Sequence, residues 1–167
     1  FAALVESDNL ELKGVNPKQA RHRGLPDRDA LIDLAQTYLE EQHRLWPQLA
    51  GQVLLPEPTD ATVDEMARQF EQAYLSGELP EFQHSANLPE GVAIGAVYSR
   101  YSDSNSNPRS LNQQLRNELH GAARERVFAP WGYVLADAAV TGTNDQRRGY
   151  QLLKALIVRP SYAIDCI

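Results

Sequence analysis

The chain has 167 residues, with 16 Lys or Arg against 22 Asp or Glu and a net charge of −6 at pH 7. This length suits one domain, or one domain with an extension, and no run approaches the ~18 apolar residues that a membrane helix needs. A single cysteine, Cys166, excludes an intramolecular disulfide framework. Together with the missing signal pattern it favours a cytoplasmic setting, and the lack of an initiator Met suggests a chain that begins inside a longer protein.

The overall charge hides two halves of opposite sign. Residues 1–90 carry 7 basic and 16 acidic side chains, a balance of −9, whereas residues 91–167 carry 9 basic and 6 acidic side chains, a balance of +3. Eight of those nine cations are arginines, the residue best suited to bidentate contact with phosphate. Residues 80–90 have the composition of a linker, so we predict an acidic, mainly helical extension over 1–90 and a separate unit over 91–167.

Two helices are expected in the acidic extension. Residues 27–46 place apolar side chains at helical spacing and are followed by Pro47, which ends the pattern. Thr62 is predicted to cap a second helix, with Glu65 three residues later completing a capping box, and Gly77 is expected to stop it. Residues 27–76 are predicted to be mostly helical and to pack loosely, or through a separate contact, against the sheet of the second unit.

Strands and helices alternate in the second unit. This alternation predicts an α/β fold with a mostly parallel sheet and helices on its faces, of which the chain holds only the first part. Ser110 is predicted to cap the first helix, with Gln113 as the partner in its capping box. The expected elements are strand 92–99, the helix that begins at Ser110, strand 133–136, helix 149–157 and strand 162–167.

The most informative residues follow the first expected strand. Ser102 lies just past its carboxyl end, where α/β sheets present their ligands. Arg100, two residues earlier, leaves an extended backbone on the same side. A serine hydroxyl is a poor nucleophile unless a base or nearby positive charge favours its alkoxide, and guanidinium groups stabilise the charge that gathers on an attacked phosphodiester.

The segment Tyr98-x-Arg100-x-Ser102 resembles the Tyr-x-Arg-Val-Ser signature of the serine recombinase (resolvase/invertase) family. After a polar loop, Ser110-Leu111-x-x-Gln114 is similar to the family's Ser-Leu-x-x-Gln at the start of its first helix. Tyr101 departs from the small branched residue that the family has between its arginine and serine.

Two further segments resemble the same family. Asp137-Ala-Ala-Val-Thr141-Gly142-Thr143 looks like its Asp-x-x-x-Ser-Gly segment after the second strand, and the residues from Arg147 to Leu153 resemble the Arg-x-Gly-(x)2-Leu-(Leu/Met) opening of the next helix. Arg148 neighbours Arg147, but the spacing to the flanking glycines makes Arg147 the match. The four motifs occur in the family's order and cover about 75 residues.

The resemblance implies roles for five residues. Ser102 would attack a scissile phosphate and form a 5′-phosphoserine link to DNA, while Arg100 and Arg147 would hold that phosphate and offset its developing charge. Gln114 and Asp137 would belong to the surrounding polar network. The family uses no metal and no nucleotide cofactor, and it acts as dimers or tetramers on DNA. The resemblance thus implies a resolvase-like fold and an enzyme that cuts and rejoins DNA strands.

A second arginine cluster, Asp-Arg-x-x-Arg, follows the third strand in the family. The chain ends at Ile167, before such a segment, so we expect these 167 residues to be inactive by themselves. Two other interpretations stay open: a non-catalytic DNA-associated module that keeps the resolvase-like fold, and an unrelated α/β phosphate-binding domain with a static anion site.

Overall fold

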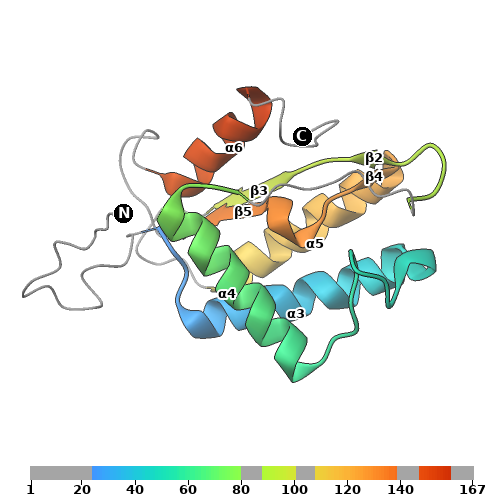
Figure 1. Ribbon diagram of the computed structural model, residues 1–167, viewed down its shortest axis with the longest axis horizontal. Helices are drawn as coiled ribbons and strands as arrows, with labels where there is room; N and C mark the ends of the chain where they lie inside the picture. Colours follow the sequence, from blue (N-terminus) through green and yellow to red (C-terminus); the bar gives the residue numbers. More distant parts are fainter. Residues whose placement is uncertain (1–23, 80–87, 101–107, 139–146, 159–167) are drawn as a thin grey trace, which may run out of the picture.

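A computed structural model describes residues 24–79, 88–100, 108–138 and 147–158 of the chain. Their fold is mixed α/β, with helices on both sides of short parallel strand pairs (Figure 1). None of the described helices is both long and apolar enough to cross a membrane. In chain order the elements are α3 (Arg28–Leu45), η1 (Pro47–Leu49), α4 (Asp60–Ser76), β2 (Ala93–Ile94), β3 (Val97–Arg100), α5 (Pro108–Arg124), β4 (Val127–Phe128), η2 (Trp131–Tyr133), β5 (Val134–Asp137) and α6 (Arg148–Val158).

The expected first strand is real, but it is divided between two partners. β2 pairs in parallel with β4, and β3 pairs in parallel with β5, with Arg100 opposite Asp137 at the end of the second pair. The break arises because the partner strand is interrupted by the turn of η2, between β4 and β5. The prediction of parallel strands is therefore confirmed for these pairs, while the expected third strand, 162–167, lies outside the described residues.

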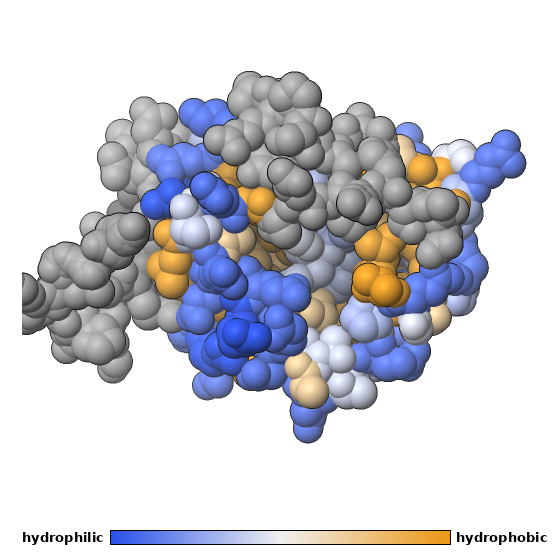
Figure 2. All heavy atoms as spheres, in the orientation of Figure 1, coloured by the Kyte–Doolittle hydropathy of each residue, from blue (hydrophilic) through white to orange (hydrophobic). Residues whose placement is uncertain are grey.

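Helices cover both faces of the strands. α6 packs on β5 and β3 from one side, and α5 packs on β3 and β4 from the other (Figure 1). α3 lies against α5, and α4 lies against α3, η2 and α6. Figure 2 shows hydrophilic side chains over the outward side of α4, as expected for a helix that buries only its inner stripe.

The two predicted helices of the extension are present, with one cap misassigned. α3 begins after Asp27, whose carboxylate accepts from the amide of Ala30, as a helix N-cap does. α4 is capped by Thr59 and not by Thr62, because the Thr59 hydroxyl accepts from the Thr62 amide and starts the helix three residues earlier than predicted. Gly77 ends α4 in the left-handed conformation, as predicted.

The helices of the second unit also agree with the predicted ranges, with small shifts at their ends. α5 begins at Pro108, a residue favoured in a first helical turn, so Ser110 lies inside the helix and the predicted Ser110 cap is wrong. Its apolar stripe is buried at Leu111, Leu115 and Leu119. α6 covers the expected 149–157 helix.

The extension is joined to the strands by one hydrophobic core, so the expectation of loose packing is wrong. Leu31 and Leu34 of α3, Phe70 of α4, Leu115 of α5 and Val134 of β5 all belong to a single buried cluster. Buried polar contacts cross the same boundary. Among them, the Tyr38 hydroxyl donates to the Ala129 carbonyl, the Trp131 indole donates to the Met66 carbonyl, and the Tyr74 hydroxyl donates to Asp137. The apolar stripes of α3 and α4 face this core, which is why both helices pack tightly. The boundary near residue 90 stays a prediction from composition.

Gly149, in the first turn of α6, is needed for a close approach between helix and strand. A Cβ at this position would lie 2.7 Å from the carbonyl oxygen of Ala136 and 2.8 Å from a carboxylate oxygen of Asp137. Both distances are shorter than real Cβ contacts, and neither the backbone carbonyl nor the bonded carboxylate is free to move. The absence of a side chain thus allows α6 to begin directly on the end of β5.

We predict that Gly149→Ala destabilises the fold by about 1–3 kcal/mol, since an added methyl group here overpacks a rigid contact. Gly121→Ala in α5 is the matched control, because the nearest atom to its Cβ would be Arg124 Nη2 at 3.8 Å. That change should be neutral or stabilising by up to about 1 kcal/mol, as alanine favours a helix over glycine. Chemical denaturation of both variants measures the difference, and equal stabilities would contradict the close approach.

Candidate functional site

A buried carboxylate marks the carboxyl edge of the β3–β5 pair. Asp137, the last residue of β5, is fully buried, and each of its oxygens accepts two hydrogen bonds. Oδ1 accepts from the Tyr74 hydroxyl at 2.5 Å and the Gly149 amide at 2.9 Å. Oδ2 accepts from the Tyr98 hydroxyl at 2.7 Å and the Tyr150 amide at 3.0 Å. The carboxylate thereby ties together β5, β3, α4 and the amino end of α6, where the helix dipole favours negative charge.

Arg100 is the last residue of β3, beside this carboxylate, and Gln114 holds it through its backbone groups. The side-chain amide of Gln114 in α5 donates to the Arg100 carbonyl at 2.6 Å, and its oxygen accepts from the Arg100 amide at 3.0 Å. This pair of bonds fastens the end of β3 to α5 after the ladder with β5 stops. The Arg100 side chain itself is exposed, so it is available to a ligand approaching the edge.

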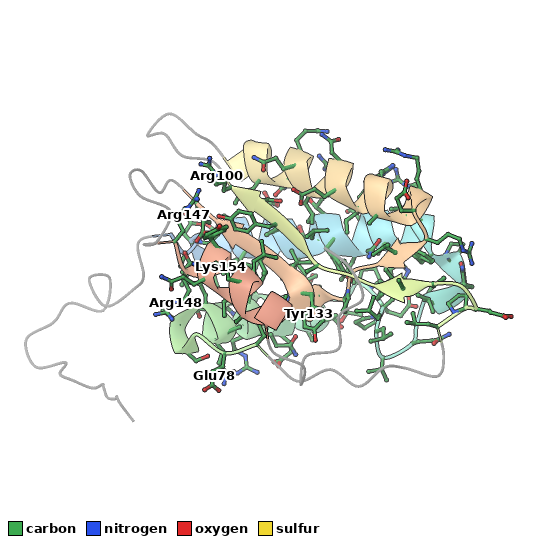
Figure 3. All side chains as sticks on the ribbon, turned by 90° about the horizontal axis from the view of Figure 1, so that it is seen from above. Glu78, Arg100, Tyr133, Arg147, Arg148 and Lys154 are labelled. Atoms are coloured by element: carbon green, nitrogen blue, oxygen red, sulfur yellow. The ribbon has the colours of Figure 1, made fainter. Side chains whose placement is uncertain are left out.

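Arg147 lies at the same edge, immediately before α6. Only 6% of its surface is exposed, and its Nε has no hydrogen-bond partner among the described residues. Its guanidinium lies 5.3 Å from the ring centre of Tyr150, a favourable cation–π arrangement. Figure 3 shows Arg100 and Arg147 together at one end of the strands. A buried guanidinium with an unused donor is well suited to receive an anion.

Arg148 points elsewhere, although it is the next residue in the chain. A Cβ on Gly77 would collide with the Arg148 guanidinium, so this side chain lies against the carboxyl end of α4. Its separation from Arg147 and Arg100 is visible in Figure 3. A cation is favourable at the carboxyl end of a helix, so the two adjacent arginines have different surroundings and only Arg147 faces the edge.

Tyr98 connects the two arginines electrostatically to Asp137. Burial raises the pKa of its hydroxyl most, and the hydrogen bond to Asp137 raises this pKa further, while the positive charges of Arg147 and Arg100 act in the opposite direction. The hydroxyl therefore stays protonated at neutral pH and serves as a hydrogen-bond donor. With its acceptor positions occupied by four donors, Asp137 is arranged to hold the edge in place and not to remove a proton from a nucleophile.

A second carboxyl group lies on the opposite face of β3. Ser99 alternates with Tyr98 and Arg100, and its hydroxyl donates to Glu118 of α5 at 2.8 Å. Burial raises the pKa of Glu118 to about 7, although the bond from Ser99 opposes the shift. Glu118 thus titrates near neutral pH beneath the strand that carries Arg100.

The sequence-based site calls have different outcomes. Arg100 and Asp137 lie opposite each other at the ends of β3 and β5, Gln114 of α5 bonds the Arg100 backbone, and Arg147 precedes α6 at the same edge. Their catalytic roles stay a prediction. Ser102 lies outside the described residues.

Sequence reasoning missed Tyr74 and Glu118. Tyr74 follows the helical spacing of the apolar stripe of α4, and Glu118 lies next to the buried Leu119 on α5. A polar group at or beside a core position was the signal that could have found them.

Comparison of the chain with protein-family models, curated proteins and solved structures finds no match. The resemblance to serine recombinases therefore rests on the four sequence motifs alone. Within the described ranges, no three His, Cys, Asp or Glu side chains are grouped so that they could hold a metal ion.

We predict that Glu118→Gln removes a pH dependence of stability. The folded protein holds the Glu118 proton more tightly than the unfolded chain does, so this group makes the wild type lose stability as pH rises from about 4.5 to about 7, with no further loss above. The variant should match the wild type near pH 4.5 and exceed it at pH 8. Urea denaturation at several pH values measures this, with the exposed Glu125→Gln as control; parallel curves for Glu118→Gln and wild type would contradict the assignment.

Proposed function

We propose that the chain belongs to a site-specific DNA recombinase of the serine type, which cleaves and rejoins strands through a 5′-phosphoserine intermediate. The observation that carries the proposal is the meeting of Arg100 and Arg147 at one edge, from a strand end and a helix start 47 residues apart. Ser102 follows Arg100 by two residues, so a nucleophile of this chain would enter the same region.

Phosphoryl transfer gives a chemical reason for two arginines at this edge of the strands. In the proposed step the Ser102 hydroxyl loses its proton, its oxygen bonds to phosphorus, and the bond from phosphorus to the 3′ oxygen of the DNA breaks. The released 3′ oxygen gains a proton, and the reverse reaction with another 3′ hydroxyl rejoins strands. One phosphoester replaces another, so the step needs no outside energy source. Guanidinium groups offset the charge that develops on the phosphate oxygens.

The burial of Arg147 supports an electrostatic role. A guanidinium in a poorly hydrated place interacts with an anion more strongly than it would in water, and removing it from water is costly unless its donors find partners. A phosphodiester oxygen would supply the acceptor that Nε of Arg147 lacks among the described residues. Gln114 and Asp137 are then positioning residues, since their polar atoms bind backbone and side chains of the protein.

The two alternatives predict different chemistry at the same edge. A non-catalytic DNA-associated module would bind DNA without forming a covalent link, and a static anion site would bind inorganic phosphate without preferring DNA. The basic balance of residues 91–167 favours a polyanion over a single phosphate. Formation of a covalent adduct separates the recombinase from both.

The test uses the full-length protein that contains this chain. Binding sites are first selected from random duplex DNA, and covalent protein–DNA adducts are then followed on denaturing gels. Ser102→Ala should abolish the adduct and leave DNA binding largely intact, because the hydroxyl forms the bond while affinity comes mainly from phosphate and groove contacts. Arg100→Ala and Arg147→Ala should slow adduct formation about 100–1000-fold.

Arg124→Ala is the control for the arginine variants. Arg124 is exposed in the last turn of α5 and takes no part in the edge, so its loss should leave adduct formation within a few-fold of the wild type. An adduct that persists in Ser102→Ala would overturn the assignment of Ser102 as the nucleophile. The 167 residues alone should give no adduct, since they contain no second arginine motif of the family's kind.

A further inference from the structure

The strongest link between the acidic extension and the candidate site is a hydroxyl of α4. Tyr74 is 1% exposed, and its hydroxyl donates to Asp137 Oδ1 at 2.5 Å across 63 residues of chain. The same oxygen accepts the amide of Gly149, in the first turn of α6. A residue from the extension and the start of the arginine-bearing helix therefore share one acceptor atom.

We propose that Tyr74 is a positioning residue for the phosphate-binding edge, acting through Asp137 on the start of α6 and on Arg147; this inference rests on the proposed recombinase function. The extension then contributes to the geometry of the site and is not only a spacer. No residue of the four recombinase-like motifs lies in α4, so the resemblance does not supply this role.

Geometry gives the route from Tyr74 to Arg147. Asp137 holds α6 through the amides of Gly149 and Tyr150, and Arg147 is fixed between that first turn and the Tyr150 ring. Loss of the Tyr74 hydroxyl leaves a buried carboxylate oxygen with one donor in place of two. A carboxylate with an unfilled acceptor position draws in water or shifts toward other donors, and either change moves the helix start.

Arg148, the first residue of α6, adds a second contact between α6 and α4. Its guanidinium lies against the carboxyl end of α4, one turn from Tyr74, where a cation is stabilised by the helix dipole. α4 therefore touches α6 through Tyr74, by way of Asp137, and through Arg148. These contacts, at the first two residues of α6, restrict the rotation of the helix and so the direction in which Arg147 points.

The extension also offers a matched control. Tyr38 of α3 is fully buried, and its hydroxyl donates at 2.6 Å to the Ala129 carbonyl, which lies between β4 and η2. Tyr38→Phe and Tyr74→Phe each delete one buried hydroxyl that bridges the extension to the second unit. Of these two hydroxyls, only that of Tyr74 reaches Asp137. A general loss of stability would therefore affect both variants, whereas a positioning effect would appear in Tyr74→Phe alone.

The experiment compares the two variants in the full-length protein by two measurements. Hydrogen exchange with mass spectrometry follows the amides of peptides covering α6, and single-turnover adduct formation follows the chemical step at saturating DNA. Tyr74→Phe is expected to speed exchange at the start of α6 and to slow adduct formation about 10-fold, with the DNA dissociation constant unchanged. Tyr38→Phe is expected to change neither α6 exchange nor the adduct rate.

Each outcome decides something. Unchanged α6 exchange in Tyr74→Phe would overturn the positioning role, whatever the chemistry of the site. Faster α6 exchange with an unchanged adduct rate would also overturn it, as would equal effects of Tyr38→Phe on both measurements. If the wild type forms no adduct while Tyr74→Phe still loosens α6 selectively, the mechanical link stands and the proposed recombinase function is the part that fails.

Discussion

Everything at the candidate site depends on one buried carboxylate. Asp137 has no exposed surface, and four donors from three separate parts of the chain fill its acceptor positions. A charged group in such a place is tolerated only when its lone pairs are satisfied. The same donors that make its burial possible also fix the positions of β3, α4 and α6 relative to the end of β5, so stability and site geometry have a common origin.

This arrangement explains how two arginines from distant segments can be held at one edge. Arg100 is fixed through its backbone by Gln114, and Arg147 is fixed by the helix start that Asp137 anchors on β5. Neither guanidinium depends on a salt bridge with a described residue for its position. The proposed phosphoryl transfer requires both groups to bind an external anion, and the unpartnered Nε of Arg147 is the donor that the described residues leave for it.

The acidic extension has a different place in the molecule from the one its composition suggested. Its net charge of −9 and its linker-like end indicated a separate part, yet its apolar stripes complete the core beneath the strands. Most charged side chains of α3 and α4 are exposed to water, and Glu41 of α3 is the buried exception among them. The composition of these helices reflects mainly their exposed residues, whereas a minority of apolar residues forms the core that they share with the strands.

Local signals in the sequence were enough for the helices and for the edge residues. The Gly77 stop and the span of α6 each follow from short-range backbone chemistry, and the parallel strand order brings Arg100 and Asp137 to one edge. Thr59 and Thr62 are equally good caps by residue type, so only the folded backbone distinguishes them. The role of Tyr74 could not be predicted, because its partner is 63 residues away and a tyrosine in an apolar stripe is equally compatible with a core position.

Replacement of Asp137 by asparagine tests the central claim most directly. Asparagine keeps the shape but offers one acceptor oxygen and places an amide donor against two existing donors. The account predicts a loss of at least about 2 kcal/mol in unfolding free energy, together with faster hydrogen exchange confined first to the start of α6. An Asp137→Asn protein with wild-type stability and unchanged α6 exchange would contradict the claim that this carboxylate organises the edge.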